Sequence, residues 1–127
     1  METTTIKATE ICPTSTFKRV QEGALLVDVR EENEIQQVAF NVPKIMYVPI
    51  SEFEKRFSEI PQDREVILVC QSGSRSLKAT YFLMNHGYTH VVNMHSGIER
   101  WIKKGFPIIG DASSVQSDSC CSSNSCC

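Results

Sequence analysis

Residues 66–76, VILVCQSGSRS, determine the fold predicted for this chain. The first five are apolar without interruption, which is typical of a strand buried on both faces in a parallel sheet. A polar turn follows and leads into residues 74–86, where apolar side chains recur at helical spacing and a glycine comes after the end. A buried strand, a short loop and a helix in this order indicate an α/β unit.

The same alternation continues on both sides of this unit. Apolar runs at residues 24–29, 45–48 and 91–92 predict further strands. Helices are predicted at 13–22, 31–37, 51–60 and 97–104, the third because Ser51 and Glu54 have the spacing of a capping box. The predicted fold is therefore α/β, with a central, mainly parallel sheet flanked by helices.

The chain has 127 residues, of which 41% are hydrophobic and 22% charged, and its net charge is −2. We expect one domain, residues 1–110, followed by a disordered Cys/Ser-rich tail, residues 111–127. The charge balance favours neither nucleic acid nor an anionic membrane as a partner. No apolar run approaches a membrane span, and no signal peptide is visible at the start, so we expect a cytoplasmic location.

The six cysteines do not form the pattern of a disulfide framework. Cys12 and Cys70 are isolated, whereas Cys120, Cys121, Cys126 and Cys127 crowd the last eight residues. Without an export signal we expect thiols, and Cys12 has no assigned role. The four tail thiols have two alternative interpretations, a disordered segment with no fixed role, or a site for a thiophilic metal or for sulfur received from Cys70.

Cys70 stands where a buried strand ends and a loop leads into a helix. Consecutive N–H groups of such a loop can form an anion-binding cradle, and the helix dipole favours negative charge there. Gly73 permits a tight turn and Arg75 adds a permanent cation. These features favour a thiolate nucleophile. The alternative is a buried structural cysteine.

The spacing within the loop separates two chemistries. Phosphatases that use a cysteine loop have the pattern C-x5-R, whose loop encloses a phosphate. Cys70 and Arg75 are separated by four residues, C-x4-R, which makes a smaller cradle suited to a sulfur atom carried on the cysteine. Sulfur transfer is therefore favoured over dephosphorylation or arsenate reduction.

At residues 10–110 the chain resembles the rhodanese family in its single-domain form. Several motifs of that family occur in the expected order. They are Asp28-Val29-Arg30-Glu31, the strand and loop at 66–76, L-x3-G-Y-x2-V at 83–91, and G-x3-W-x3-G-x-P at 97–107. The chain departs from the family at residues 40–45, where only Val42-Pro43 echoes Gly-His-Ile-Pro-Gly-Ala, and at Ser96-Gly97, where two glycines are common.

The resemblance implies a thiosulfate sulfurtransferase without a cofactor. In the family, the loop cysteine takes sulfane sulfur from a small anionic donor such as thiosulfate and holds it as a persulfide. A thiol, a protein thiol or cyanide then accepts the sulfur. Cys70 is accordingly the predicted catalytic residue, and the predicted substrate-binding residues are Gln71, Ser72, Gly73, Ser74, Arg75 and Ser76. Arg75 is expected to steer the donor or to brace the loop.

Asp28 and Arg30 are candidates for support of the site. Asp28 either orients the site, by pairing with Arg75, or forms a local structural ion pair or a turn cap, and the second interpretation is favoured. No metal ligand set is predicted, because His86, His90 and His95 lack metal-binding spacing with any cysteine. The alternative function is a trafficking module that carries a thiophilic metal or persulfide sulfur with its cysteine-rich tail.

Overall fold

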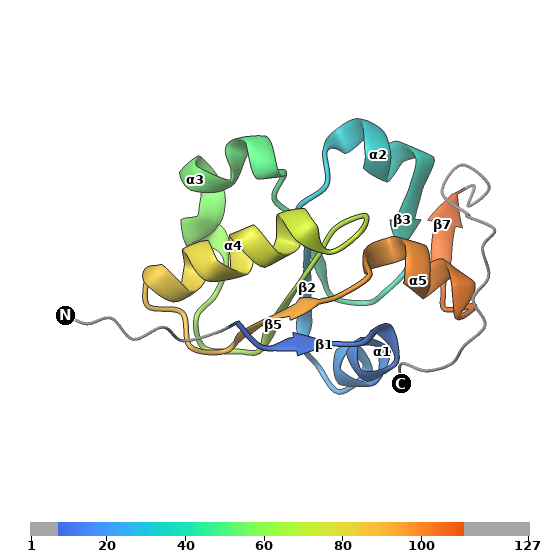
Figure 1. Cartoon of the computed structure of the whole chain (residues 1–127), viewed down its shortest axis with the longest axis horizontal. Helices are drawn as coiled ribbons and strands as arrows, with labels where there is room; N and C mark the ends of the chain where they lie inside the picture. The colour runs from blue at the N-terminus through green and yellow to red at the C-terminus, as the bar shows by residue number, and fades with distance from the viewer. Residues whose placement is uncertain (1–7, 111–127) are drawn as a thin grey trace.

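A computed structural model describes residues 8–110 (Figure 1). Five strands form one sheet in the order β1-β6-β5-β2-β4, and every neighbouring pair is parallel. The strands are β1 (Glu10–Ile11), β6 (Val91–Met94), β5 (Val66–Val69), β2 (Leu25–Asp28) and β4 (Ile45–Tyr47). The predicted α/β class with a mainly parallel sheet is confirmed.

Helices cover both faces of this sheet. On one face, residues of α3 (Phe53–Arg56) and α4 (Ser74–Asn85) form a core with the strands, and on the other face α1 (Pro13–Gln21) and α5 (Gly97–Lys103) do so. Along β5, Val66 and Leu68 belong to the first core, and Ile67 and Val69 to the second. This alternation explains the unbroken apolar run, because successive side chains of a strand point to opposite faces.

The carboxyl ends of the central strands meet at one edge of the sheet. There β2 leads into α2 (Glu32–Gln37), and β5 leads through a short loop into α4. A second, antiparallel pair of strands, β3 (Val38–Phe40) and β7 (Ile108–Gly110), lies beside α2 and α5 (Figure 1). Because ligands of parallel α/β sheets bind at the carboxyl ends, this edge is where a site is expected.

The predicted capping box at Ser51 is wrong. Ser51 lies within a 3-10 turn, η1 (Ile50–Glu52), and the expected long helix is divided into α3 and a second turn, η2 (Phe57–Glu59). A capping box is found instead at Glu31 and Glu34, at the start of α2. The Ser51 amide and hydroxyl donate to the Glu31 carboxylate, so the serine helps to fix a neighbouring helix rather than its own.

Two sequence predictions about cysteines have different outcomes. Cys12 is disulfide-bonded rather than a free thiol, which contradicts the expectation for it, and Cys70 is the free cysteine in the described part of the chain. The four tail cysteines lie outside the described residues, and so does the predicted tail. Within residues 8–110, no helix has both the length and the hydrophobicity needed to cross a bilayer.

Candidate functional site

Cys70 follows directly after β5 and is completely buried. The strand is hydrogen-bonded on both sides, to β2 and to β6, so its carboxyl end has little freedom to move. Residues 70–73 then cross to the first turn of α4. The predicted strand, loop and helix are therefore present, with the thiol at the junction.

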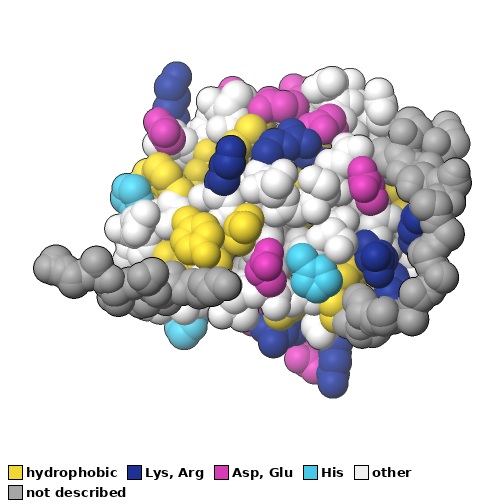
Figure 2. All heavy atoms as spheres, in the orientation of Figure 1, with side chains coloured by type: hydrophobic (Ala, Val, Ile, Leu, Met, Phe, Trp, Pro, Cys, Tyr) yellow, Lys and Arg dark blue, Asp and Glu magenta, His cyan; other side chains and the backbone are white. Residues whose placement is uncertain are grey.

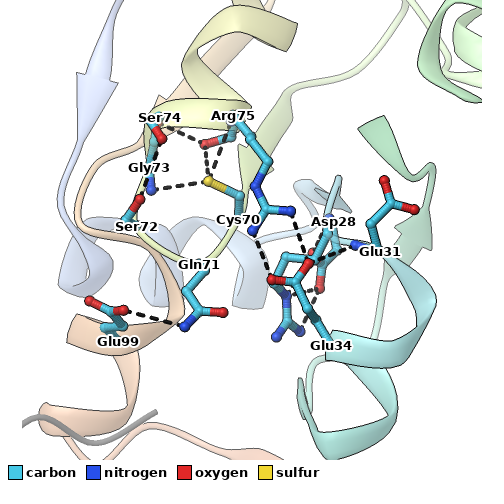
Figure 3. A network of polar contacts seen from close by, with 12 residues as sticks. Asp28, Glu31, Glu34, Cys70, Gln71, Ser72, Gly73, Ser74, Arg75 and Glu99 are labelled. Carbon is cyan, nitrogen blue, oxygen red and sulfur yellow. Dashed lines mark hydrogen bonds and ion pairs between the residues drawn. The ribbon is translucent and has the colours of Figure 1, made fainter. Parts of the chain in front are cut away.

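Three hydrogen-bond donors converge on the Cys70 sulfur (Figure 3). The Gly73 amide nitrogen lies 3.0 Å from Sγ, and the amide nitrogen and hydroxyl oxygen of Ser76 each lie 3.4 Å from it. Gly73 is the N-cap of α4, a helix of 12 residues, so the sulfur also lies at the positive end of a helix dipole. This arrangement stabilises negative charge on sulfur.

The loop conformation requires glycine at position 73. Its φ of 102° is in the left-handed region, which L side chains rarely adopt. A Cβ atom here would also lie 3.0 Å from the Ser96 backbone nitrogen. Any side chain at this position would therefore move the amide that contacts the Cys70 sulfur.

The start of α5 is joined to the Cys70 loop by backbone hydrogen bonds. The Ile98 amide donates to the Cys70 carbonyl over 2.9 Å, and the Glu99 amide donates to the Gln71 carbonyl over 3.4 Å. Gly97 allows this close approach, because a Cβ atom there would lie 2.1 Å from the Gln71 carbonyl oxygen. The sequence analysis gives Gly97 as the first residue of the G-x3-W-x3-G-x-P motif, but the contact of Gly97 with the Cys70 loop was not predicted.

A buried polar chain lies behind the sulfur. The Ser76 hydroxyl is within hydrogen-bonding distance of Sγ, of the Gly73 carbonyl and of Asn93 Oδ1. The Asn93 amide group donates to Glu10 over 2.8 Å and to the Gly73 carbonyl over 3.3 Å, which fixes the orientation of its oxygen. Because Ser76 has one hydroxyl proton, it bonds to one of its acceptors at a time. Asn93 and Glu10 were not predicted as neighbours of the site.

Arg75 is held by a carboxylate and does not stand free at the loop. Its guanidinium donates two hydrogen bonds, of 2.9 and 2.8 Å, to the two oxygens of Glu34 on α2 (Figure 3). The hydrogen bond from Arg75 is the main cause that lowers the pKa of Glu34, and the same bond raises the pKa of Arg75. Glu34 was not predicted as a site residue, because Glu31 is not among the N-cap residues that mark a capping box in a sequence.

Asp28 forms a pair with Arg30, not with Arg75. The two side chains are fully buried, and the Arg30 guanidinium donates to both Asp28 oxygens over 2.9 to 3.2 Å. Arg30 also lies over the Phe40 ring, 5.7 Å from its centroid. This geometry is the local structural pair favoured from the sequence, whereas any role in the site stays a prediction.

The other predicted binding residues lie on the outer side of the loop. Gln71 donates from its side-chain amide to Glu99 over 3.4 Å, and the hydroxyl oxygens of Ser72 and Ser74 are 3.4 Å apart. Of the six residues predicted to bind substrate, Gly73 and Ser76 therefore contact the sulfur, and Arg75 contacts Glu34. Substrate contacts by Gln71, Ser72 and Ser74 stay a prediction.

Comparison with known proteins identifies relatives of the whole α/β unit. A family model for the rhodanese-like domain matches residues 14–104. A sulfurtransferase of Allochromatium vinosum is 42% identical over 88 residues, which cover 69% of this chain and 80% of the relative. The thiosulfate sulfurtransferase GlpE of Haemophilus influenzae is 30% identical over 100 residues, covering 78% of this chain and 92% of that protein.

A similar fold occurs among solved structures. The crystal structure of a rhodanese-related protein from Thermoplasma volcanium superposes with a TM-score of 0.71 and 24% identity, covering 84% of this chain and 100% of that one. At this identity the likeness concerns the fold alone. It agrees with the parallel sheet and the flanking helices described above.

Proposed function

The chain belongs to the family of rhodanese-like domains, and from that premise we propose that it is a sulfurtransferase that carries sulfane sulfur as a persulfide on Cys70. Its sulfurtransferase relatives support sulfur transfer as the class of reaction. The observation that carries the persulfide is the set of three donors around the Cys70 sulfur. Thiosulfate is the donor we propose to test first.

In the first half of the reaction, the Cys70 thiolate attacks the outer sulfur of thiosulfate. A bond forms between Sγ and that sulfur, the sulfur–sulfur bond of thiosulfate breaks, and its electron pair leaves with sulfite. The product is a persulfide anion on Cys70. The Gly73 and Ser76 amides that face Sγ are suited to stabilising the charge that develops on the transferred sulfur.

In the second half, a nucleophile attacks the terminal sulfur of the persulfide. Cyanide leaves as thiocyanate, or a thiolate leaves as a new persulfide, and the electron pair of the broken bond returns to Sγ. The donors that faced the first thiolate then face the regenerated one. The Gly73 and Ser76 amides therefore serve both halves of the cycle, and the Ser76 hydroxyl lies within reach of the sulfur in each.

Burial of Cys70 sets a condition on this cycle. The residue has no exposed surface in the conformation described, so side chains near the loop must move before a donor reaches Sγ. A dephosphorylating enzyme would have to admit a larger phosphoryl group to the same position. The small loop, C-x4-R, and the sulfurtransferase relatives both favour sulfur transfer.

The test is to incubate the full chain with thiosulfate, without reductant, and to weigh the intact protein. We expect the mass of one added sulfur atom, located by peptide mapping at Cys70 and removed by cyanide. Cys70→Ser should take up none, whereas wild-type protein treated in parallel should carry one added sulfur. Sulfur uptake by folded Cys70→Ser would refute the mechanism.

A further inference from the structure

An anionic sulfur donor needs positive charge near the loop, and Arg75 is poorly placed to supply it. Both terminal nitrogens of its guanidinium donate to the Glu34 carboxylate. The negative charge of that carboxylate, 2.8 Å from the nearer nitrogen, offsets the positive charge of Arg75. Glu34 would also repel an anion that approached from that side. A side-chain cation that attracts a donor must therefore come from another element near the loop.

On the other side of the loop, a hollow of about 210 Å³ is lined by two cations, Arg100 and Lys103. Its lining residues are Ser72, Ser96, Glu99, Arg100 and Lys103. Within residues 8–110, neither Arg100 nor Lys103 has an ion-pair partner. In Figure 2, Lys and Arg side chains gather on the face over α5. Figure 3 shows Ser72 and Glu99 on the opposite side of Cys70 from Glu34.

The hollow is joined to the reactive loop by backbone contacts. Ser72 lies two residues after Cys70, and Ser96 begins the turn whose next residue, Gly97, packs against the Gln71 carbonyl. Arg100 and Lys103 are three residues apart on α5 and so share one face of that helix. The two cations and the two serine hydroxyls therefore lie at the outer rim of the loop that holds the sulfur.

We propose that this hollow binds the oxyanion of a small sulfur substrate, a sulfonate or a carboxylate, through Arg100 and Lys103 with Ser72 and Ser96 as hydroxyl donors. The proposal rests on the sulfurtransferase function and assigns its selectivity for anions to α5. A guanidinium binds a sulfonate or a carboxylate with paired N–H donors, and a lysine adds a point charge. The volume suits a small ligand and is too small for a folded protein.

Glu99 gives the hollow a further property. Its carboxylate accepts a hydrogen bond from the Gln71 side chain over 3.4 Å, so it lies on the loop side of the hollow. The charged lining is thus two cations and one carboxylate, a set that attracts a monoanion or dianion without binding every anion tightly. This balance suits a substrate that must leave after each turnover.

The test compares Arg100→Gln, Lys103→Gln and the double variant with a matched control, Lys104→Gln. The control removes the same charge from the next residue, at the end of α5 and outside the lining of the hollow. Thermal unfolding confirms that each variant is folded. Rates are measured over a range of ionic strength, because screening weakens attraction between exposed charges.

The first arm measures loading of Cys70 by thiosulfate. The second starts from preloaded protein and compares release of sulfur to 3-mercaptopropionate, which is anionic, with release to 2-mercaptoethanol, which is neutral. For the anionic substrate that the hollow binds, thiosulfate or 3-mercaptopropionate, we expect the double variant to react about tenfold more slowly and to lose much of the salt dependence of its rate. A loss of this size lies within the range of electrostatic steering. Lys104→Gln and the neutral thiol should show changes below about twofold.

The outcomes show whether the hollow binds the sulfur donor or the sulfur acceptor. A loss confined to loading assigns the hollow to the donor, and a loss confined to release assigns it to the acceptor. Equal rates in the double variant and the wild type, or equal losses in Lys104→Gln, would overturn the proposal while leaving the persulfide on Cys70 intact. Failure of the wild type to take up sulfur on Cys70 would instead overturn the proposed function.

Discussion

Two arginine–carboxylate pairs lie near the same edge of the sheet, in different surroundings. Asp28 and Arg30 are two residues apart in sequence and completely buried. Glu34 and Arg75 are 41 residues apart, and their side chains are 26% and 32% exposed. Both pairs are bidentate, so the difference between them is one of environment and of what they connect.

The buried pair fixes one segment, and the exposed pair joins two. Asp28 Oδ1 also accepts the Arg30 backbone amide, so this pair sets the turn at the end of β2. The Glu34–Arg75 pair connects α2 with the first turn of α4, where the Cys70 loop ends. The Asp28–Arg30 pair should therefore mainly affect the stability of the fold. The Glu34–Arg75 pair should mainly affect the position of the Cys70 loop.

The largest expected effect is on the buried pair. Asp28→Ala leaves the Arg30 guanidinium buried without a counter-charge, so we expect the free energy of unfolding to fall by about 3–5 kcal/mol. Sulfur loading per folded molecule should stay unchanged, because neither residue contacts the Cys70 sulfur. Urea unfolding and loading rates corrected for the folded fraction measure the two quantities.

The control removes both charges together. Asp28→Leu combined with Arg30→Met fills the site with apolar atoms and should recover most of the lost stability, since a buried pair often contributes little beyond a well-packed apolar replacement. If Asp28→Ala were as stable as the wild type but loaded sulfur much more slowly, the buried pair would act in the site rather than in stability.

The features that the sequence predicts are those whose contacts join residues close together in the chain. The β5 strand, Cys70 and the start of α4 are adjacent in sequence, and apolar runs and turn residues specify them locally. The Asp28–Arg30 pair is local as well, and a local ion pair or turn cap was the favoured interpretation of Asp28. Glu34 and Arg75 are brought together because the strands that precede their helices, β2 and β5, pair side by side in the sheet, which no local pattern records.

The misassigned helix start has a similar cause. Ser51 and Glu54 have capping-box spacing, but Ser51 bonds instead to Glu31, which lies 20 residues earlier. Strand β3 was missed because it has three residues and its partner strand, β7, lies at the other end of the domain, with Val38 opposite Gly110 and Phe40 opposite Ile108. In each case a tertiary partner outweighs the local preference.

The second effect concerns sulfur loading. If Arg75 acts by bracing the loop through Glu34, then Glu34→Gln and Arg75→Gln should both slow loading by thiosulfate, each by about two- to fivefold, which corresponds to roughly 0.5–1 kcal/mol. Stopped-flow loading followed by cyanide release of thiocyanate measures the rates. A slower Arg75→Gln together with a faster Glu34→Gln would show that Arg75 attracts the donor directly.

A smaller effect is the coupling within the exposed pair. The double-mutant cycle of Glu34→Gln and Arg75→Gln should give a coupling of about 0.5–1 kcal/mol in urea unfolding, because partial exposure screens the charges. Arg56 and Glu59, an exposed pair three residues apart in sequence, provide a comparison cycle on the same protein. A coupling above 3 kcal/mol would place the Glu34–Arg75 pair in the same class as the buried one.

The smallest effect is the pH dependence of the exposed pair. The hydrogen bond from Arg75 lowers the pKa of Glu34 in the folded protein, so the unfolded chain binds more protons between the two pKa values. The pair's stabilisation is therefore fully present above the unfolded carboxyl pKa of about 4.3 and is lost as the pH falls through the lower folded pKa. Unfolding curves of wild type and Arg75→Gln should differ by a constant amount above about pH 5 and converge in more acidic buffer. Curves that stayed parallel to the lowest pH at which both proteins fold would mean that the Glu34 carboxylate gains nothing from Arg75.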